Sequence, residues 1–147
     1  MRLAIVNGPN LNLLGEREPG VYGNTGFDAF LQTLRERFPG IDLSVYQSNV
    51  EGEIINHLHA LRHQTDGIVI NPGGYSHTSV AIADALKTMT CPCIEVHISQ
   101  VHAREDFRQT LITARSCQGV ISGFGLEGYA MAIGYLAAHP VQPVAHS

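Results

Sequence analysis

The sequence has no tryptophan, one lysine and three cysteines, and each scarcity limits the chemistry that the chain can carry. Lys87 is the only side chain on which a Schiff base could form. It falls late in an expected helix, where a cation near the carboxyl end is common. The odd cysteine count and the Cys91-Pro92-Cys93 spacing argue against a disulfide framework, a C-x-x-C redox pair and a zinc site. We expect all three thiols, including Cys117, to be small buried side chains.

Charge and long hydrophobic runs are also scarce. Nine Lys and Arg against thirteen Asp and Glu give a net charge of −4, so no basic surface for nucleic acid is expected. No apolar run reaches the roughly 18–20 residues that span a bilayer. The first apolar segment, 3–6, is too short for a signal-peptide core. We therefore expect one domain over residues 1–147, located in the cytoplasm, without a membrane or nucleic-acid partner.

Familiar cofactor and nucleophile motifs are missing as well. The chain contains no Walker loop and no G-x-S-x-G. His59 and His63 lack the acid that completes H-E-x-x-H, and no other metal-ligand set is recognisable. A flavin site is disfavoured because the first long loop has no Ser/Thr-rich phosphate cradle. The expectation is chemistry without a metal or cofactor.

What is present is an alternation of short apolar β-branched runs with segments of helical periodicity. This alternation predicts a parallel sheet with helices on both faces. For this length we expect a flavodoxin-like three-layer sandwich with five strands in the order 2-1-3-4-5. The expected strands are 3–6, 41–46, 67–70, 93–96 and 119–122; the expected helices are 27–38, 51–61, 79–89, 103–114 and 127–139, followed by a loose tail over 140–147.

Such a sheet binds ligands beyond the carboxyl ends of its strands, near strands one, three and four. The loop after strand one, 7–23, is rich in Gly, Pro and Asn, and its part around 16–24 is a candidate lid that carries Arg17 and Tyr22. The loop after strand three, 71–79, enters a helix, with Ser76, Thr78 and Ser79 as candidate N-caps. Plain solvated or capped turns remain the alternatives for both loops.

Strand four ends with Glu95 and His97, which share a face because they are two residues apart. A carboxylate beside an imidazole favours the protonated form of the imidazole and orients the ring, as a general acid requires. A purely structural histidine is the alternative. Arg104 and Arg108 follow at i and i+4 of the helix expected over 103–114, as an anion clamp or as a solvated pair.

Together the three loops offer acid–base chemistry on an anionic, hydroxyl-rich small molecule. Tyr22 could act as a base only if its pKa, roughly 10 when unperturbed, were lowered. A desolvated cation beside the phenolate has this effect, and Arg17 is the obvious candidate.

Several polar and glycine-rich blocks of the sequence together match the pattern of a known family. These blocks are 7–15, 17–19, 22–23, 47–49, 51–53, 71–73, 75, 77–79 and Glu95-Val96-His97 with Ser99. In this order, and over about residues 3–138, they resemble type II 3-dehydroquinate dehydratases. The resemblance implies cofactor-free dehydration of 3-dehydroquinate to 3-dehydroshikimate, in the shikimate pathway or in quinate breakdown. It also implies a homododecamer built as a tetramer of trimers.

The resemblance also implies a role for each matching residue. Tyr22 is the implied base at C2, Arg17 keeps it ionised, and Asn10 helps to hold a water at the enolate oxygen. His97 is the implied acid, with Glu95 as its partner. The implied substrate-binding residues are Asn71, His77, Ser99, Arg108, the backbone at Ile98, and Asp84 from a neighbouring subunit.

The chain departs from the family pattern at Ala83, Gly74, Gln100 and 109–111, none of which is an implied catalytic position. Two other functions stay open. One is a non-catalytic module that binds a nucleotide or a protein, because a fold alone does not decide activity. The other is an isomerase or lyase that acts on a different cyclic hydroxy-ketone acid.

Overall fold

A computed structural model describes residues 1–15 and 26–141. Its centre is a five-stranded parallel sheet with the order β2-β1-β3-β4-β5, which confirms the predicted topology. The strands are β1 (Arg2–Asn7), β2 (Asp42–Gln47), β3 (Gly67–Asn71), β4 (Cys93–His97) and β5 (Gly119–Ser122). β3 and β4 are buried along their whole length, as apolar strands covered on both faces should be.

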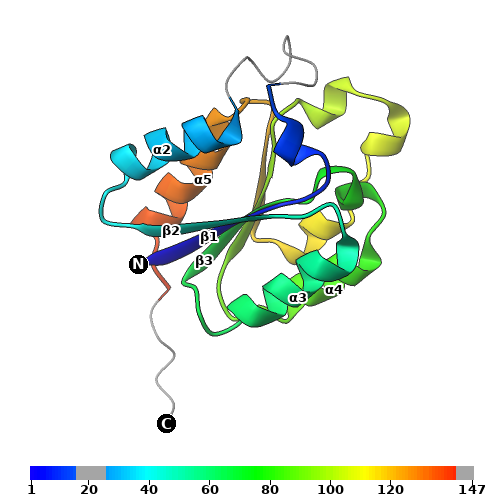
Figure 1. Cartoon of the computed structure of the whole chain (residues 1–147). Coiled ribbons are helices and arrows are strands. Elements are labelled where there is room, and N and C mark those ends of the chain that lie inside the picture. The colour runs from blue at the N-terminus through cyan, green and yellow to red at the C-terminus, as the bar shows by residue number, and fades with distance from the viewer. Residues whose placement is uncertain (16–25, 142–147) are drawn as a thin grey trace.

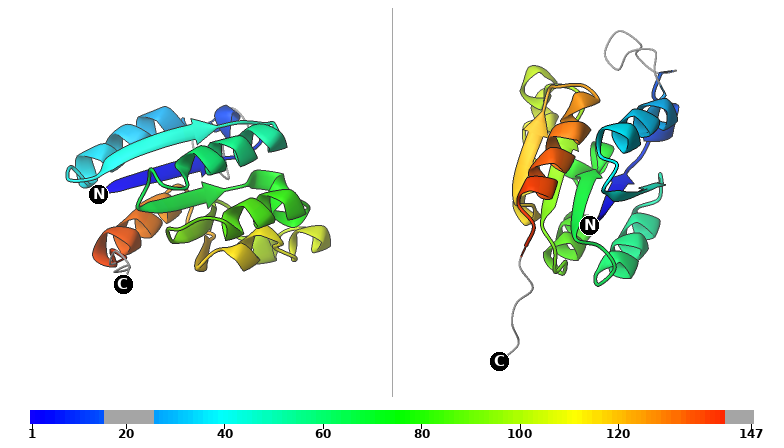
Figure 2. Two further views of the ribbon diagram at one scale, coloured as in Figure 1. Left: turned by 90° about the horizontal axis from the view of Figure 1, so that it is seen from below. Right: turned by 90° about the vertical axis from the view of Figure 1, so that its left-hand side faces the viewer.

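Among the described residues, four α-helices form the outer layers. α2 and α5 cover one face of the sheet, and α3 and α4 cover the other (Figures 1 and 2). Their bounds are α2 (Phe27–Arg37), α3 (Glu51–Leu61), α4 (Val80–Lys87) and α5 (Glu127–Ala138). Alternate residues of β1 enter opposite cores: Leu3 and Ile5 pack with α2 and α5, whereas Ala4 and Val6 pack with α3 and α4.

The prediction of one helix over 103–114 is wrong. That region holds three short 3-10 helices instead, η3 (Val101–Ala103), η4 (Asp106–Arg108) and η5 (Thr113–Ser116). The side chain of Gln109 explains part of the difference, because its amide donates to the carbonyls of Val101, Arg104 and Glu105. Carbonyls engaged by a side chain compete with the regular helical ladder. The other 3-10 helices in the part of the chain that the structure describes are η1 (Leu11–Leu13) and η2 (Gly73–His77).

Several local predictions are confirmed in part. Ser79 is the N-cap of α4, where its hydroxyl accepts from the backbone N–H of Ile82 at 2.9 Å. Lys87 lies in the last turn of the same helix and is exposed. Of the thiols, Cys93 is buried, whereas Cys91 and Cys117 are only half-buried.

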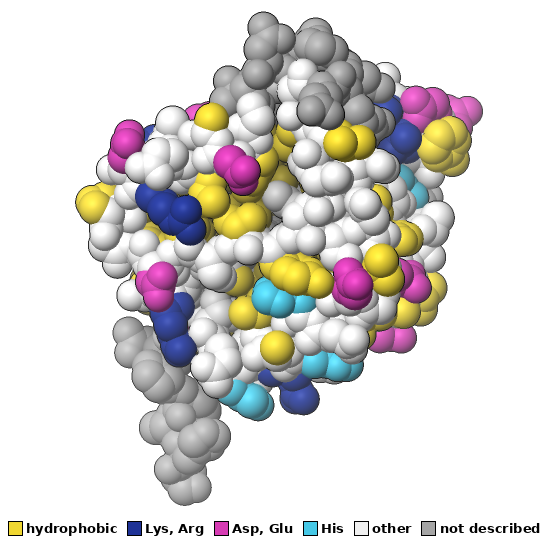
Figure 3. Space-filling model, viewed as in Figure 1, with side chains coloured by type: hydrophobic (Ala, Val, Ile, Leu, Met, Phe, Trp, Pro, Cys, Tyr) yellow, Lys and Arg dark blue, Asp and Glu magenta, His cyan; other side chains and the backbone are white. Residues whose placement is uncertain are grey.

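The surface shows no strong segregation of charge on the face seen in Figure 3. There, the Lys and Arg side chains of the coloured residues lie among Asp and Glu and form no continuous basic area. Within the described residues, no helix has the length and apolar character needed to cross a membrane.

Candidate active site

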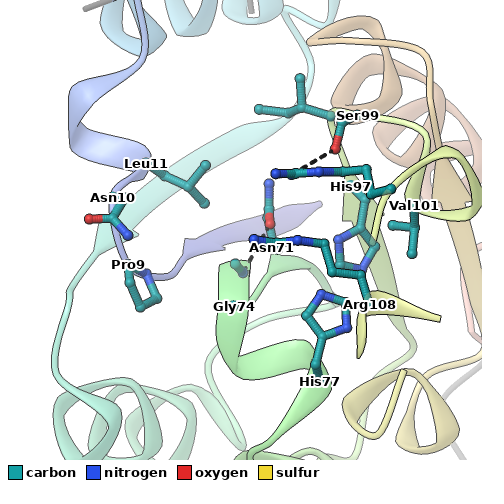
Figure 4. Close-up of a pocket in the computed structure, with 13 residues that line it drawn as sticks. Pro9, Asn10, Leu11, Asn71, Gly74, His77, His97, Ser99, Val101 and Arg108 are labelled. Atoms are coloured by element: carbon teal, nitrogen blue, oxygen red, sulfur yellow. Dashed lines mark hydrogen bonds between the residues drawn. The ribbon is translucent and has the colours of Figure 1, made fainter. Parts of the chain in front are cut away.

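A cavity opens at the carboxyl ends of β1, β3 and β4, where the topology predicts a ligand site (Figure 4). Asn10 and its neighbours line one side, His77 and Arg108 the other, and Asn71 lies between them. The lining residues are Pro9, Asn10, Leu11, Asn71, Gly73, Gly74, His77, His97, Ile98, Ser99, Val101, Arg104 and Arg108. Seven residues that the sequence analysis singled out for the site are therefore brought together: Asn10, Asn71, His77, His97, Ile98, Ser99 and Arg108.

Of the four other predicted site residues, two lie away from the cavity lining and two fall outside the described residues. Glu95 lies behind the cavity wall, in contact with His97. Asp84 is exposed on α4 and does not line the cavity. Arg17 and Tyr22 fall outside the described residues, as do the whole candidate lid, 16–24, and residues 142–147 of the expected tail.

The predicted pairing of Glu95 with His97 is observed. Nε2 of His97 lies 2.8 Å from Oε2 of Glu95. The carboxylate is fully buried and the imidazole is 7% exposed, so the pair is shielded from water on every side except the cavity. The other carboxylate oxygen, Oε1, accepts a hydrogen bond from the hydroxyl of Thr113 in η5. No local pattern in the sequence indicates that Thr113 takes part in the site.

A buried hydrogen-bond chain fixes Asn71. Its amide donates to the hydroxyl of Tyr129 at 2.9 Å, and that hydroxyl donates to Oδ1 of Asn7 at 2.8 Å. The side-chain oxygen of Asn71 accepts from the backbone N–H of Gly73 at 3.1 Å. Asn71 is thus held on both ends of its amide, and its orientation in the cavity wall is set by β1, η2 and α5.

The turn after β1 has an unusual backbone. Asn10 has a φ of 71°, in the left-handed region that asparagine tolerates better than most residues. Its backbone N–H donates to the side-chain oxygen of Asn49 at 2.9 Å, which also accepts from the amide of Gln47. At Gly8 an added Cβ would lie 2.4 Å from the carbonyl oxygen of Pro72. Only glycine allows the two loops to approach so closely.

Cations and N–H donors dominate the rest of the cavity. Arg104 donates to the hydroxyl of Ser99 at 3.3 Å, and Arg108 contacts the carboxylate of Glu105 at 2.5 Å. The hydrogen bond from Arg108 lowers the pKa of Glu105. The predicted i,i+4 helical placement of Arg104 and Arg108 is wrong, since η3 and η4 are separate, yet both line the cavity.

His77 lies on the same side of the cavity as Arg108 (Figure 4) and is held in a defined orientation. Its Nδ1 lies 3.0 Å from the carbonyl oxygen of Thr110, and its ring stacks with that of His97 at a centroid distance of 6.4 Å. Burial lowers the pKa of His77, and the nearby charges of Arg108 and His97 act in the same direction against the Thr110 hydrogen bond. A neutral His77 can donate and accept hydrogen bonds.

The cavity therefore suits a small anion with several hydroxyl groups. Two arginines supply positive charge, and asparagine, histidine and serine supply directional donors and acceptors. No group of three or more His, Cys, Asp or Glu side chains suited to a metal occurs within residues 1–15 and 26–141.

Comparisons with known proteins relate the chain to one family. A family model described as dehydroquinase class II matches residues 1–137. A protein from Clostridium perfringens (strain SM101), named 3-dehydroquinate dehydratase, is 49% identical over 95% of this chain and 97% of its own length. A protein of the same name from Thermotoga neapolitana is 49% identical over 92% and 94%. The crystal structure of type II dehydroquinase from Propionibacterium acnes superposes with a TM-score of 0.89 at 41% identity, covering 94% of this chain and 97% of that one.

Proposed function

Because the chain belongs to the dehydroquinase class II family, we propose that it dehydrates 3-dehydroquinate to 3-dehydroshikimate by acid–base catalysis without a Schiff base. The observation that carries this proposal is the buried Glu95–His97 pair, whose imidazole faces a cavity lined by two arginines and by polar side chains. The family's activity supports a role in the shikimate pathway, and we expect the enzyme to work in the cytoplasm.

The first step removes a proton from C2, next to the ketone of the substrate. We assign the base to Tyr22 and the ionising cation to Arg17, on the resemblance of their sequence block to the family. The electrons of the broken C–H bond form an enolate, whose oxygen must be stabilised electrostatically. Asn10 lies on the cavity wall, with its backbone held by Asn49. On its resemblance to the family, we assign to it the support of a water at that oxygen.

The second step expels the C1 hydroxyl. His97 gives it a proton, the C1–O bond breaks, and water leaves as the C1–C2 double bond forms in conjugation with the ketone. Since Nε2 faces Glu95, the nitrogen available to the substrate is Nδ1, which has no hydrogen-bond partner among the described residues. Glu95 stabilises the imidazolium that serves as the acid.

Substrate binding is assigned to the remaining lining residues. Asn71 and His77 are rigidly oriented donors or acceptors for the hydroxyl and carboxylate groups. The backbone at Ile98, Ser99 and Arg108 completes the predicted set. Arg104, which the sequence analysis considered as an anion clamp, joins it because it reaches Ser99 in the cavity wall.

The position of Asp84 bears on the proposed assembly of several subunits. The residue is exposed on α4 and does not line the cavity of its own chain, so any contact with substrate has to be made in a neighbouring subunit. This supports the proposed homododecamer, a tetramer of trimers. Light scattering should give about twelve times the chain mass, and a stable monomer with full activity would contradict it.

The experiment that tests the function is turnover of 3-dehydroquinate by the purified chain, followed through the absorbance of the conjugated enone product. Other cyclic hydroxy-ketone acids, run in parallel, test the alternative of a related isomerase or lyase. We expect kcat/KM for 3-dehydroquinate to exceed the others by orders of magnitude. Tight binding of 3-dehydroquinate without turnover would instead indicate a non-catalytic module.

A further inference from the structure

Glu95 has one hydrogen-bond partner on each carboxylate oxygen within the described residues: His97 on Oε2 and Thr113 on Oε1. We propose that Thr113 is a positioning residue for the acid step, which holds Glu95 ionised and oriented so that His97 presents Nδ1 to the substrate. This inference rests on the proposed function, because it concerns the acid of that reaction.

The hydrogen bond from the Thr113 hydroxyl to Glu95 is shielded from water. Glu95 and Thr113 are both 0% exposed, so water does not replace a lost partner. A buried carboxylate oxygen without a donor is costly, and the side chain then rotates or takes up a proton. Either change removes the acceptor that Nε2 of His97 uses. The effect of Thr113 on the reaction is therefore transmitted through Glu95.

The direction of the hydrogen bonds adds a second argument. A hydroxyl has one proton to donate, and an ionised carboxylate can only accept. Donation from Thr113 to Oε1 therefore favours the ionised form of Glu95. Because an ionised Glu95 can only accept a hydrogen bond at Oε2, Nε2 of His97 carries a hydrogen in both the neutral and the positively charged ring. The proton that the ring gains and loses then resides on Nδ1, on the cavity side.

The position of Thr113 is itself well determined. It lies in η5, and the preceding residue, Ile112, donates its N–H to the carbonyl of Ser76 in η2 at 2.7 Å. The thiol of Cys117 reaches the carbonyl oxygen of Thr113 at 3.7 Å. η2 also carries His77, so one packed unit supports both the acid pair and a wall of the cavity.

Other charged or titratable groups surround the pair and stay unchanged when the Thr113 hydroxyl is removed. His77, Arg104 and Arg108 lie on the cavity side, and Cys117 lies behind, within range of the Glu95 charge. A shift in the pH profile on loss of one neutral hydroxyl therefore reports on the Glu95–His97 pair.

The test compares Thr113→Val, which keeps the shape and loses the hydroxyl, with Thr113→Ser, which keeps the hydroxyl. We expect Thr113→Val to lower kcat by about 10- to 100-fold, the scale of lost support for a catalytic group, with little change in KM. The alkaline limb of its pH profile should move to lower pH, because the imidazolium loses stabilisation. Thr113→Ser should restore most of kcat. Thr88→Val, which removes a hydroxyl bonded to Ala85 at the end of α4, is the matched control.

Two results would overturn the proposal: an unchanged kcat and pH profile in Thr113→Val, or an equal loss in both Thr113 variants. In a Glu95→Gln background, Thr113→Val should cause no additional loss of kcat, and a full additional loss would also contradict the proposal. If Thr113→Val does not fold, NMR of the wild type tests the hydrogen bond to Glu95 instead. We expect the hydroxyl proton of Thr113 to exchange slowly with water, and rapid exchange would contradict the proposal. Wild-type inactivity on 3-dehydroquinate would overturn the function itself, a separate outcome.

Discussion

Tyr129 donates its hydroxyl proton to the side-chain oxygen of Asn7 at 2.8 Å, although 122 residues separate the two. Tyr129 is fully buried in α5, and Asn7 ends β1. Burial raises the pKa of Tyr129, so the hydroxyl stays protonated and remains a donor over the whole working range of pH. Through its second hydrogen bond, from Asn71, the same hydroxyl ties the ends of β1 and β3 together beneath the cavity.

Tyr129→Phe should therefore damage both stability and substrate binding. The variant leaves Asn7 and Asn71 without their shared partner in a buried place, which costs about 1–3 kcal/mol of unfolding free energy. Asn71 also loses its fixed orientation, so KM should rise. Urea unfolding and steady-state kinetics measure the two effects. Tyr135→Phe, at a 40% exposed tyrosine bonded to Gln118, is the control, and equal stability of the two variants would contradict the account.

Gln109 braces the segment that carries the cavity arginines. Its amide donates to three carbonyls, those of Val101, Arg104 and Glu105, and its oxygen lies 3.0 Å from Nδ1 of His102. Gln109→Ala should loosen Arg104 and Arg108 and raise KM several-fold, with a smaller effect on kcat.

The matched control for Gln109 is Gln118→Ala, which removes an amide bonded to Tyr135 and remote from the cavity lining. Steady-state kinetics of both variants give the comparison. An unchanged KM in Gln109→Ala would show that the two arginines are held by other contacts.

The three thiols should differ in reactivity. Desolvation, with the charge of Glu95 adding to it, raises the pKa of Cys117 to about 12. A hydrogen bond with Cys93 lowers the pKa of Cys91. Since the thiolate is the nucleophile, iodoacetamide at pH 8 should label Cys91 first and leave Cys117 in the folded protein unmodified. Mass spectrometry of digested samples measures the order, and early labelling of Cys117 would contradict it.

The same raised pKa predicts how stability depends on alkaline pH. In the unfolded chain the pKa of Cys117 has its ordinary value of roughly 8.5–9. In the folded chain its pKa is raised to about 12. Its contribution is full below the unfolded pKa and is lost as pH rises towards 12, because only the unfolded chain releases the proton. The melting temperature of Cys117→Ala should fall less steeply over this window than that of the wild type. Parallel slopes would argue against a shifted thiol.

Arg17→Ala tests the cation assigned to the base. If Arg17 keeps Tyr22 ionised, its loss lowers kcat far more than it weakens binding, because the phenolate is needed for proton removal and not for affinity. Calorimetric binding of the product and steady-state kinetics give the two quantities. Similar fractional losses in both would contradict the role and leave Arg17 as a plain binding residue.

The sequence predicts the fold and the Glu95–His97 pair from local signals, whereas most other site residues are predicted from the resemblance to the family. Apolar runs and helical periodicity predict a parallel sheet covered by helices, and the chain length favours the order 2-1-3-4-5 that is observed. The two-residue spacing of Glu95 and His97 predicts that they lie together. Thr113 and Tyr129 were missed because each acts through a contact that folding alone creates, 18 residues from Glu95 and 122 from Asn7. The helix over 103–114 was wrong for a similar reason, since the side chain of Gln109 engages its carbonyls.

Turnover with and without an imine trap tests whether Tyr22 removes the proton with no lysine adduct. Turnover of 3-dehydroquinate is measured for wild type, Tyr22→Phe and Lys87→Ala, each with and without borohydride, which traps imines. Lys87 is exposed on α4 and does not line the cavity. The account predicts that wild type and Lys87→Ala are equally active and insensitive to borohydride, while Tyr22→Phe loses nearly all activity. Inactivation by borohydride together with an inactive Lys87→Ala, or full activity of Tyr22→Phe, would contradict it.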